Sequence, residues 1–292
     1  MTQAVDGRPL PRALPGGATL WVVPPLLVVA ALFAYPLALI LRQALTGDGD
    51  AASLDHFAAV LGTRAFRSAL ANTVEIALAA TAGCLAVGLT LALLLSFVPF
   101  PGSGAVARLV DTFIALPTFL VTLAFTFLYG SAGMVNAGLV DVFHLAAPPV
   151  DFLYSPWGVI LAEVTVYCPF VMRPLMAAFS LIDRAQIEVA SSLGARPGRI
   201  IRQVILPAAL PALLAGGSLC LLLTVNEFGI VLFIGAKGVI TLPLLIYDKA
   251  IQEFDYTAAC VIAVINVALS LTLFSLYRLA VGKLGGRHAA VV

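Results

Sequence analysis

Six apolar segments, each about 20 residues or more in length, dominate this chain of 292 residues. They cover residues 20–41, 70–98, 107–130, 157–182, 208–235 and 257–282. About 20 apolar residues in a helix cross the hydrocarbon core of a bilayer, where a helix satisfies its own backbone hydrogen bonds. Only 11% of the residues are charged, against about 25% in soluble domains. We therefore predict an all-α, polytopic membrane protein with about six transmembrane helices.

The first apolar segment could be a cleaved signal peptide or a retained transmembrane helix, and its length distinguishes the two. A signal peptide has an apolar core of about 7–15 residues, and residues 20–41 form a longer run. We therefore predict a retained span. The predicted domains are a tail over residues 1–19, one transmembrane domain over residues 20–282, and a second tail over residues 283–292.

Basic residues are distributed unevenly over the connections between these segments. Cytoplasmic loops of membrane proteins carry an excess of Lys and Arg. With the N-terminus inside, eleven of the 16 Lys and Arg residues fall on the cytoplasmic side and five fall outside. The connection over residues 131–156 has neither. We predict that both termini and the polar segment 183–207 lie in the cytoplasm.

Two connections on the predicted outer side contain apolar residues of their own. Residues 54–70 place apolar side chains at mixed three- and four-residue spacings: Phe57, Val60, Leu61, Phe66 and Leu70. Residues 237–256 contain the run LPLLI. One interpretation of each is a short helix at the membrane interface, and the other is a loop packed on the outer mouth of the bundle. Within the spans, we expect Pro117, Pro169 and Pro174 to introduce kinks.

The polar segment over residues 183–207, DRAQIEVASSLGARPGRIIRQVILP, interrupts this apolar chain. Residues 184–193 are predicted to form a short helix that ends at Gly194, because glycine adopts the left-handed conformation most easily. Pro197 suits the first position of a second helix, in which Ile200 and Val204 share an apolar face with their neighbours. We expect two helices, joined by a glycine turn and connected rigidly to the next span.

The spacing within this segment resembles the EAA loop of inner-membrane permeases of binding-protein-dependent ABC importers. The residues that carry the resemblance are Glu188, Ala190, Gly194, Val204, Leu206 and Pro207. Val189 and Val204 depart slightly from the usual pattern. Arg196 stands where these loops often have a serine helix cap, which predicts the loss of about 1 kcal/mol of capping stabilisation.

The resemblance extends over most of the chain, and it implies the fold of a MetI-like type I ABC importer permease. The other residues that support the resemblance are Asn72-Thr73, Leu116-Pro117, Ala215-Gly216 and Asn226-Glu227-Phe228-Gly229. It implies that segment 183–207 seats in a groove on a cytoplasmic ATP-binding subunit. Gly194 would then permit the tight turn, and Glu188 would offer a carboxylate to a basic group of that subunit. The alternative is an ordinary solvated loop.

The resemblance also implies a set of partners in the bacterial inner membrane and on its two sides. These are the cytoplasmic ATP-binding subunits, a second permease subunit that is identical or homologous, and a periplasmic substrate-binding protein. ATP and Mg²⁺ would be used by the ATP-binding subunits.

The chain itself has no sequence pattern of an enzyme. The phosphate-binding pattern G-x-x-x-x-G-K-[ST] does not occur in it. Its three histidines lie in loops or in a tail, and its four cysteines lie in apolar segments with neither metal nor disulfide spacing. The net charge of +1 gives no basic surface for nucleic acid. We expect no catalytic residue, no bound metal or cofactor, and no nucleic-acid partner.

Four polar residues in the apolar segments are candidates for the translocation path. Charges inside a membrane are unfavourable and mark functional sites by default. Glu75, Glu163 and Glu227 fall in the predicted outer thirds of their helices, and Asn226 adjoins the last of them. The competing interpretation is that these side chains reach the interface or form hydrogen-bonded pairs within the bundle.

The substrate is predicted from resemblance alone. Residues 226–235, 241–243 and 248–251 are similar to permeases for 2-aminoethylphosphonate and, less closely, to polyamine, sulfate and iron(III) permeases. The acidic candidates would suit the ammonium end of an aminophosphonate. A rival of another class is a secondary transporter driven by an ion gradient, which would show internal repeats. No such repeat is evident in the sequence.

Overall fold

The computed structural model describes residues 18–47, 49, 51–236 and 238–289. The predicted tail residues 1–17 and 290–292, as well as Lys237, lie outside these residues. Every regular element among the described residues is a helix, which confirms the all-α prediction. Six helical stretches are long and apolar enough to cross a membrane: Trp21–Thr46, Arg64–Phe97, Thr118–Phe143, Pro156–Ser180, Pro197–Val225 and Tyr256–Leu279.

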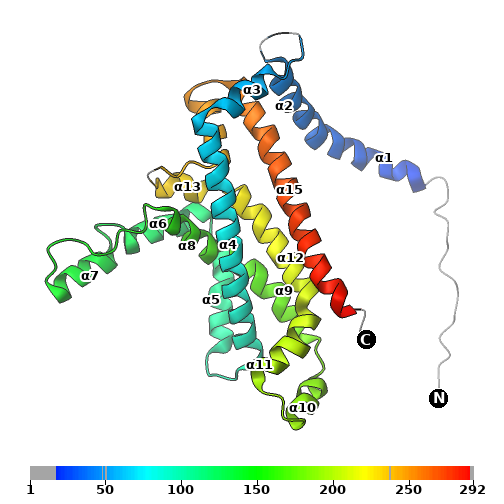
Figure 1. Cartoon of the computed structure of the whole chain (residues 1–292), viewed down its shortest axis with the longest axis vertical. Helices are drawn as coiled ribbons and strands as arrows, with labels where there is room; N and C mark the ends of the chain where they lie inside the picture. Colours follow the sequence, from blue (N-terminus) through cyan, green and yellow to red (C-terminus); the bar gives the residue numbers. More distant parts are fainter. Residues whose placement is uncertain (1–17, 48, 50, 237, 290–292) are drawn as a thin grey trace.

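The centre of the bundle is formed by α4 (Arg64–Phe97), α9 (Pro169–Ser180) and α12 (Leu206–Val225), which pack on one another. α8 (Pro156–Tyr167) packs on α4, and α15 (Tyr256–Ala289) lies along α12. Figure 1 shows α4 and α15 starting at the end that carries α3 (Asp55–Gly62), and α12 starting at the opposite end, which carries α10 (Arg184–Ser192) and α11 (Pro197–Ile200). α15 continues past residue 282, so the helix extends into the predicted C-terminal tail.

The predicted first span is a helix that contacts the rest of the molecule only near its end. It consists of α1 (Ala18–Val29), a π-helical turn η1 (Ala30–Ala34) and α2 (Tyr35–Thr46). α2 packs on α15, and Figure 1 shows α1 sloping away from the bundle. The side chains of residues 21–39 are exposed. Since they are largely apolar, lipid is their natural surrounding.

The third span differs from the prediction of one helix over residues 107–130. The chain instead forms α5 (Ser103–Ala115), α6 (Thr118–Tyr129) and α7 (Met134–Phe143). Leu116 and Pro117 are extended, with ψ of 134° and 136°. Pro117 has no N–H to donate and disfavours helical backbone at the residue before it. The predicted kink is therefore a complete break.

The fourth span is interrupted beside one of the prolines that the sequence predicts to introduce a kink. α8 ends at Tyr167 and α9 begins at Pro169, with only Cys168 between them. Cys168 keeps helical dihedral angles, so the interruption before Pro169 does not separate the two halves of the helix. Pro174 lies inside α9, and the helix continues through it. Of these two prolines, only Pro169 coincides with a helix end.

The fifth span also departs from the prediction, which placed one helix over residues 208–235. The helix begins earlier, at Pro197, and runs through α11, the π-helical turn η2 (Ile201–Ile205) and α12. In η2 the N–H of Leu206 donates to the carbonyl of Ile201, and this wider turn precedes Pro207, which cannot donate. α12 ends at Val225, and a separate helix α13 (Gly229–Ile234) follows.

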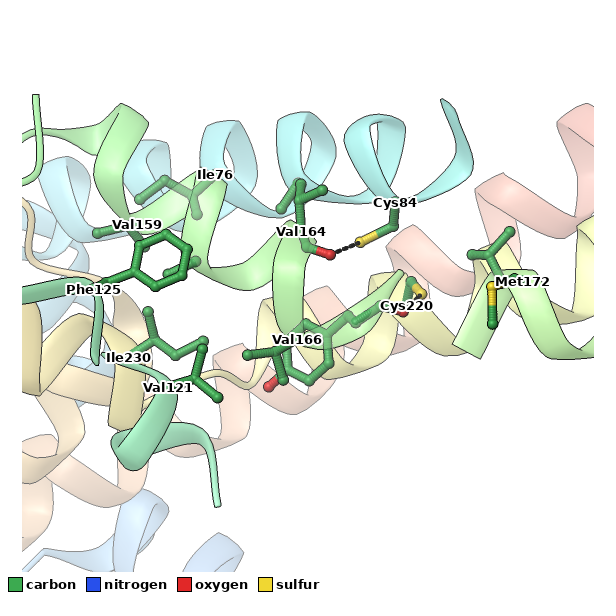
Figure 2. Close-up of a cluster of buried hydrophobic side chains, with 14 of the residues drawn as sticks. Ile76, Cys84, Val121, Phe125, Val159, Val164, Val166, Met172, Cys220 and Ile230 are labelled. Atoms are coloured by element: carbon green, nitrogen blue, oxygen red, sulfur yellow. Dashed lines mark hydrogen bonds between the residues drawn. The ribbon is translucent and has the colours of Figure 1, made fainter. Parts of the chain in front are cut away.

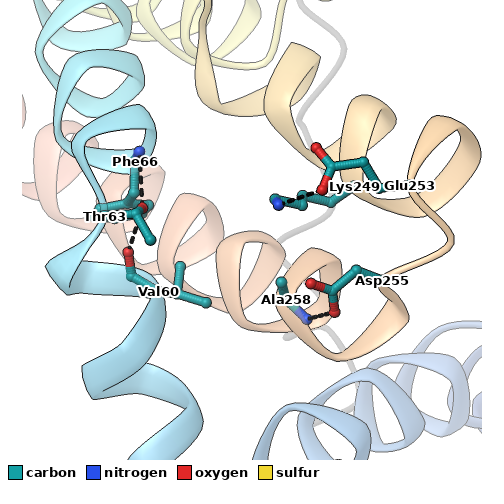
Figure 3. A network of polar contacts seen from close by, with 7 residues as sticks. All are labelled: Val60, Thr63, Phe66, Lys249, Glu253, Asp255 and Ala258. Carbon is teal, nitrogen blue, oxygen red and sulfur yellow. Dashed lines mark hydrogen bonds and ion pairs between the residues drawn. The ribbon is translucent and has the colours of Figure 1, made fainter.

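The two connections predicted to lie on the outer side both contain short helices. They are α3, and α14 (Leu242–Tyr247) with the π-helical turn η3 (Asp248–Gln252). α14 is also packed: Leu242 and Leu245 are buried against Phe66 and Ile262. In Figure 3, Thr63 caps α4 through the N–H of Phe66, Lys249 pairs with Glu253, and Asp255 accepts the N–H of Ala258 at the start of α15.

The main core joins α4, α8, α9, α12 and α13 through buried apolar side chains. Figure 2 shows Cys84, with its thiol directed to the carbonyl of Val164, and Cys220 nearby. Cys84, Cys168 and Cys220 are buried, and Cys260 is half-buried. Val171 of α9 is enclosed by two glycines, because a Cβ at Gly88 or Gly216 would lie 2.8 or 2.9 Å from its atoms. The three central helices therefore approach closely because these two residues lack side chains.

One buried side chain, Asn136, holds the segment around α7 in place through hydrogen bonds to the backbone on both sides of the helix. The Asn136 amide donates to the carbonyls of Gly130 and Val150 at 2.9 and 2.8 Å, and its oxygen accepts the N–H of Val150 at 2.9 Å.

Asn136→Ala leaves these backbone groups unsatisfied, at a cost of about 1–3 kcal/mol. We expect residues 130–156 to be cut faster by protease in the purified protein. Asp141→Ala, an exposed change on the same helix, should leave the rate unchanged; equal rates for both variants would contradict the prediction.

Candidate functional site

The segment over residues 183–207 has the predicted shape of two helices joined by a glycine turn. The Asp183 carboxylate begins α10 by accepting the N–H of Ala185 at 2.9 Å. α10 ends at Ser192, and Gly194 follows with φ of +76°. An added Cβ at Gly194 would meet no atom within 4 Å. Glycine is therefore needed there for its left-handed backbone and not for lack of space.

The second half of the segment anchors it to the bundle. Pro197 begins α11, and Arg196 makes no capping hydrogen bond, as predicted. Ile200 and Ile205 are buried. The half-buried positions of the motif are Ala190, Val204, Leu206 and Pro207. These four residues therefore support the position of the segment, while Glu188 and Gly194 are exposed.

α10 presents two different faces. Arg184, Ile187 and Glu188 line a groove of about 710 Å³ between α10 and the ends of α4 and α9. Val189 and Leu193, one turn apart, are 59% and 83% exposed. The two side chains form a small exposed apolar surface at the end of an otherwise polar helix, and this surface is a candidate contact site. The sequence prediction did not include Leu193, although its spacing of four residues from Val189 was visible.

Inside the bundle, the structure brings two of the four polar candidates together. Glu227 follows the end of α12 and is buried. Its carboxylate accepts the hydroxyl of Tyr167 from α8 and, at 2.8 Å, the N–H of Ile230 in the first turn of α13. Glu163 lies one helical turn before Tyr167 on α8 and is 1% exposed. Tyr167 thus holds Glu227 beside the face of α8 that also carries Glu163.

The other two candidates lie elsewhere. Glu75 is exposed on α4. Asn226 faces α15: its amide oxygen accepts from Asn266 at 3.0 Å, and its amide nitrogen is 3.3 Å from the hydroxyl of Ser270. Arg173 pairs with Asp111, which links α9 to α5. Asn226 and Glu227 thus form hydrogen bonds within the bundle, as the competing interpretation states.

Comparison with known proteins decides the family. Residues 84–285 match the model of the binding-protein-dependent transport system inner membrane component. The chain belongs to this family. Two relatives, from Salmonella paratyphi A and Salmonella typhimurium, are named as 2-aminoethylphosphonate transport system permease protein PhnU. Each is 63% identical over 92% of this chain, which covers 93% and 94% of their lengths.

The fold of the permease is that of ABC importer permeases. A chain of a bacterial ABC transporter involved in the import of the acidic polysaccharide alginate superposes with a TM-score of 0.79 at 18% identity, over 91% of the permease and 95% of that chain. The permease is therefore a multi-pass inner-membrane subunit of an ABC transporter and not itself the ATPase.

Proposed function

We propose that this permease imports 2-aminoethylphosphonate across the inner membrane, driven by ATP hydrolysed on separate subunits. The observation that carries the proposal is its 63% identity, over nearly the whole length of both chains, to permeases named for that compound. The bundle adds support, because its buried acidic residues Glu163 and Glu227 suit the cationic end of an aminophosphonate better than a sulfate dianion.

Segment 183–207 is the proposed contact with the ATP-binding subunits. It is exposed, has a defined shape and is continuous with a membrane helix. The apolar pair Val189 and Leu193 would enter a groove of that subunit, and the Gly194 turn would present it. Glu188 would pair with a basic group of the same partner. ATP and Mg²⁺ would be bound by the partner and not by the permease.

The proposed cycle is alternating access. ATP binding closes two ATP-binding subunits, which draws together segment 183–207 of this permease and its counterpart in a second permease subunit. The helices then tilt and open toward the periplasm, where a substrate-binding protein delivers its ligand. Hydrolysis restores the inward-facing state. This arrangement places segment 183–207 and both termini in the cytoplasm, as the distribution of basic residues predicts.

Uptake of radiolabelled 2-aminoethylphosphonate tests the proposal. The permease would be expressed with an ATP-binding subunit and a binding protein for 2-aminoethylphosphonate, in cells that lack other phosphonate importers. We expect uptake that requires the permease and is not reduced by excess sulfate or spermidine. Uptake that is equal with and without the permease, or that sulfate abolishes, would contradict the proposed substrate.

A further inference from the structure

Glu163 is buried in the membrane bundle without a partner for its carboxylate. Its side chain is 1% exposed, and within the described part of the chain neither carboxylate oxygen has a hydrogen-bond partner. An ionised carboxylate in such surroundings is strongly unfavourable unless a cation or several donors compensate for it. Buried polar groups without partners are rare in native proteins, so this one calls for an explanation.

The helices that pack on α8 supply no cation that pairs with Glu163. They carry four basic residues: Arg64 and Arg67 in the first turn of α4, Arg108 in α5 and Arg173 in α9. Arg108 and Arg173 are exposed, and Arg173 is already paired with Asp111. Val164, the neighbour of Glu163, packs against Gly83 of α4. Gly83 lies about 24 Å along that helix from Arg67 at 1.5 Å per residue. A cation that pairs with Glu163 must therefore come from outside these helices.

Glu227 has hydrogen-bond partners for its carboxylate and Glu163 has none among the described residues, so Glu163 is available to bind a ligand. Glu227 already accepts the Tyr167 hydroxyl and the Ile230 N–H, which stabilise its negative charge. Glu163 accepts nothing among the described residues. Because Tyr167 stands one turn after Glu163 on α8, the three side chains form one cluster with two carboxyl groups.

The cluster lies where two membrane helices are interrupted. One break, at Leu116 and Pro117, precedes Thr118, and the other, after Val225, contains Glu227. The two breaks meet beside Gly229: a Cβ there would lie 3.1 Å from the Thr118 hydroxyl and 3.4 Å from a Glu227 carboxylate oxygen. Irregular backbone at membrane depth is tolerated where it is buried in protein or lines a cavity.

We propose that Glu163, together with Glu227, binds the primary ammonium group of the substrate during translocation; this inference rests on the proposed import of an aminophosphonate. An ammonium group offers three N–H donors, and the free oxygens of Glu163 are acceptors without donors. The same two carboxylates repel a phosphonate, so they orient the substrate with its amino end toward α8. In the conformation described here, Glu163 is closed off from solvent, and the substrate reaches it when the helices around the two breaks separate.

Binding of labelled 2-aminoethylphosphonate to the purified permease–ATPase complex, without binding protein, tests this assignment. Glu163→Gln keeps the size of the side chain and removes its charge. We expect it to weaken binding at least tenfold, while Glu163→Asp, which keeps the charge, binds more tightly than Glu163→Gln. Unlabelled ethylphosphonate, which lacks the ammonium group, should compete poorly with the label on the unaltered complex.

The control is Glu253→Gln, the same exchange at an exposed, ion-paired residue of the outer connection, which should bind like the unaltered complex. The inference fails if Glu163→Gln binds normally, as it would if Glu163 always carried a proton. It also fails if ethylphosphonate competes as well as 2-aminoethylphosphonate, or if Glu163→Gln and Glu163→Asp lose binding and thermal stability equally. In each of these cases uptake by the unaltered importer can persist, so the proposed function is judged separately.

Discussion

Leu193→Asp is expected to reduce ATP-driven uptake about tenfold or more, because it removes the apolar contact through which α10 would meet an ATP-binding subunit. The side chain of Leu193 is 83% exposed in the permease alone. The exchange therefore removes almost no packing within the chain, and the thermal stability of the isolated permease should not change. Burial of a leucine side chain stabilises a contact by about 1.5–3 kcal/mol, and a buried carboxylate in its place opposes docking further.

Leu181→Asp is the matched control for this prediction. Leu181 is 86% exposed, follows the end of α9 and lies just before residues 183–207. The same exchange at nearly the same exposure should leave uptake and copurification with the ATP-binding subunit unchanged. Both quantities would be measured for the two variants after affinity purification of the permease. Normal copurification of Leu193→Asp, or an equal loss in both variants, would show that the α10 surface is not the contact.

Gly216→Leu is expected to abolish the folded permease. A Cβ at Gly216 would lie 2.9 Å from the Val171 Cα and 3.0 Å from the Phe170 carbonyl oxygen, both backbone atoms of α9. Backbone atoms in the middle of a helix cannot relieve a clash by a change of rotamer, as a side chain can. On the other side of Val171, Gly88 leaves no space for α9 to move. Overpacking of a core costs about 1–3 kcal/mol even where side chains can adjust, and we expect more here.

The measurement is the amount of monodisperse permease recovered in detergent, together with its unfolding temperature. Gly104→Leu in α5 serves as control, because an added Cβ there would meet no atom within 4 Å. It should be recovered at the normal level. If Gly216→Leu gave a normal yield and unfolding temperature, the close packing of α9 between α4 and α12 would be refuted.

The sequence predicts the spans well because a membrane helix is identified by its own composition. All six apolar segments contain helix, and Pro117 and Pro169 mark helix ends through their missing N–H groups. The end of α12 after Val225 was not predicted. There the Asn226 amide donates to the Leu222 carbonyl at 2.8 Å, and the Glu227 carboxylate accepts the N–H of Ile230. These bonds are made by side chains that are also held by α8 and α15, so no local pattern reveals them.

The two candidate sites differ in the same way: one is formed by residues close together in the sequence, and the other by residues that only the fold brings together. Segment 183–207 is contiguous, so the spacing of Glu188, Gly194 and Pro197 was sufficient to predict its shape. The cluster inside the bundle joins Tyr167 to Glu227 across 60 residues of sequence. Single-residue reasoning identified Glu163 and Glu227 as unusual, but it grouped them with Glu75, which the fold places on an exposed face. The grouping depends on which helices are neighbours, and a single sequence does not show that.

The helix that starts in segment 183–207 has a mechanical consequence. Pro197–Val225 is one uninterrupted stretch of 29 residues, a lever arm of about 43 Å at 1.5 Å per residue. If one end is held, a swing of about 10° displaces the other by about 7 Å, which exceeds the rise of one helical turn. Glu227 lies two residues beyond the far end of this arm. In the proposed cycle, a small rotation of this helix would thereby be amplified into a stroke long enough to pull a carboxylate away from Tyr167.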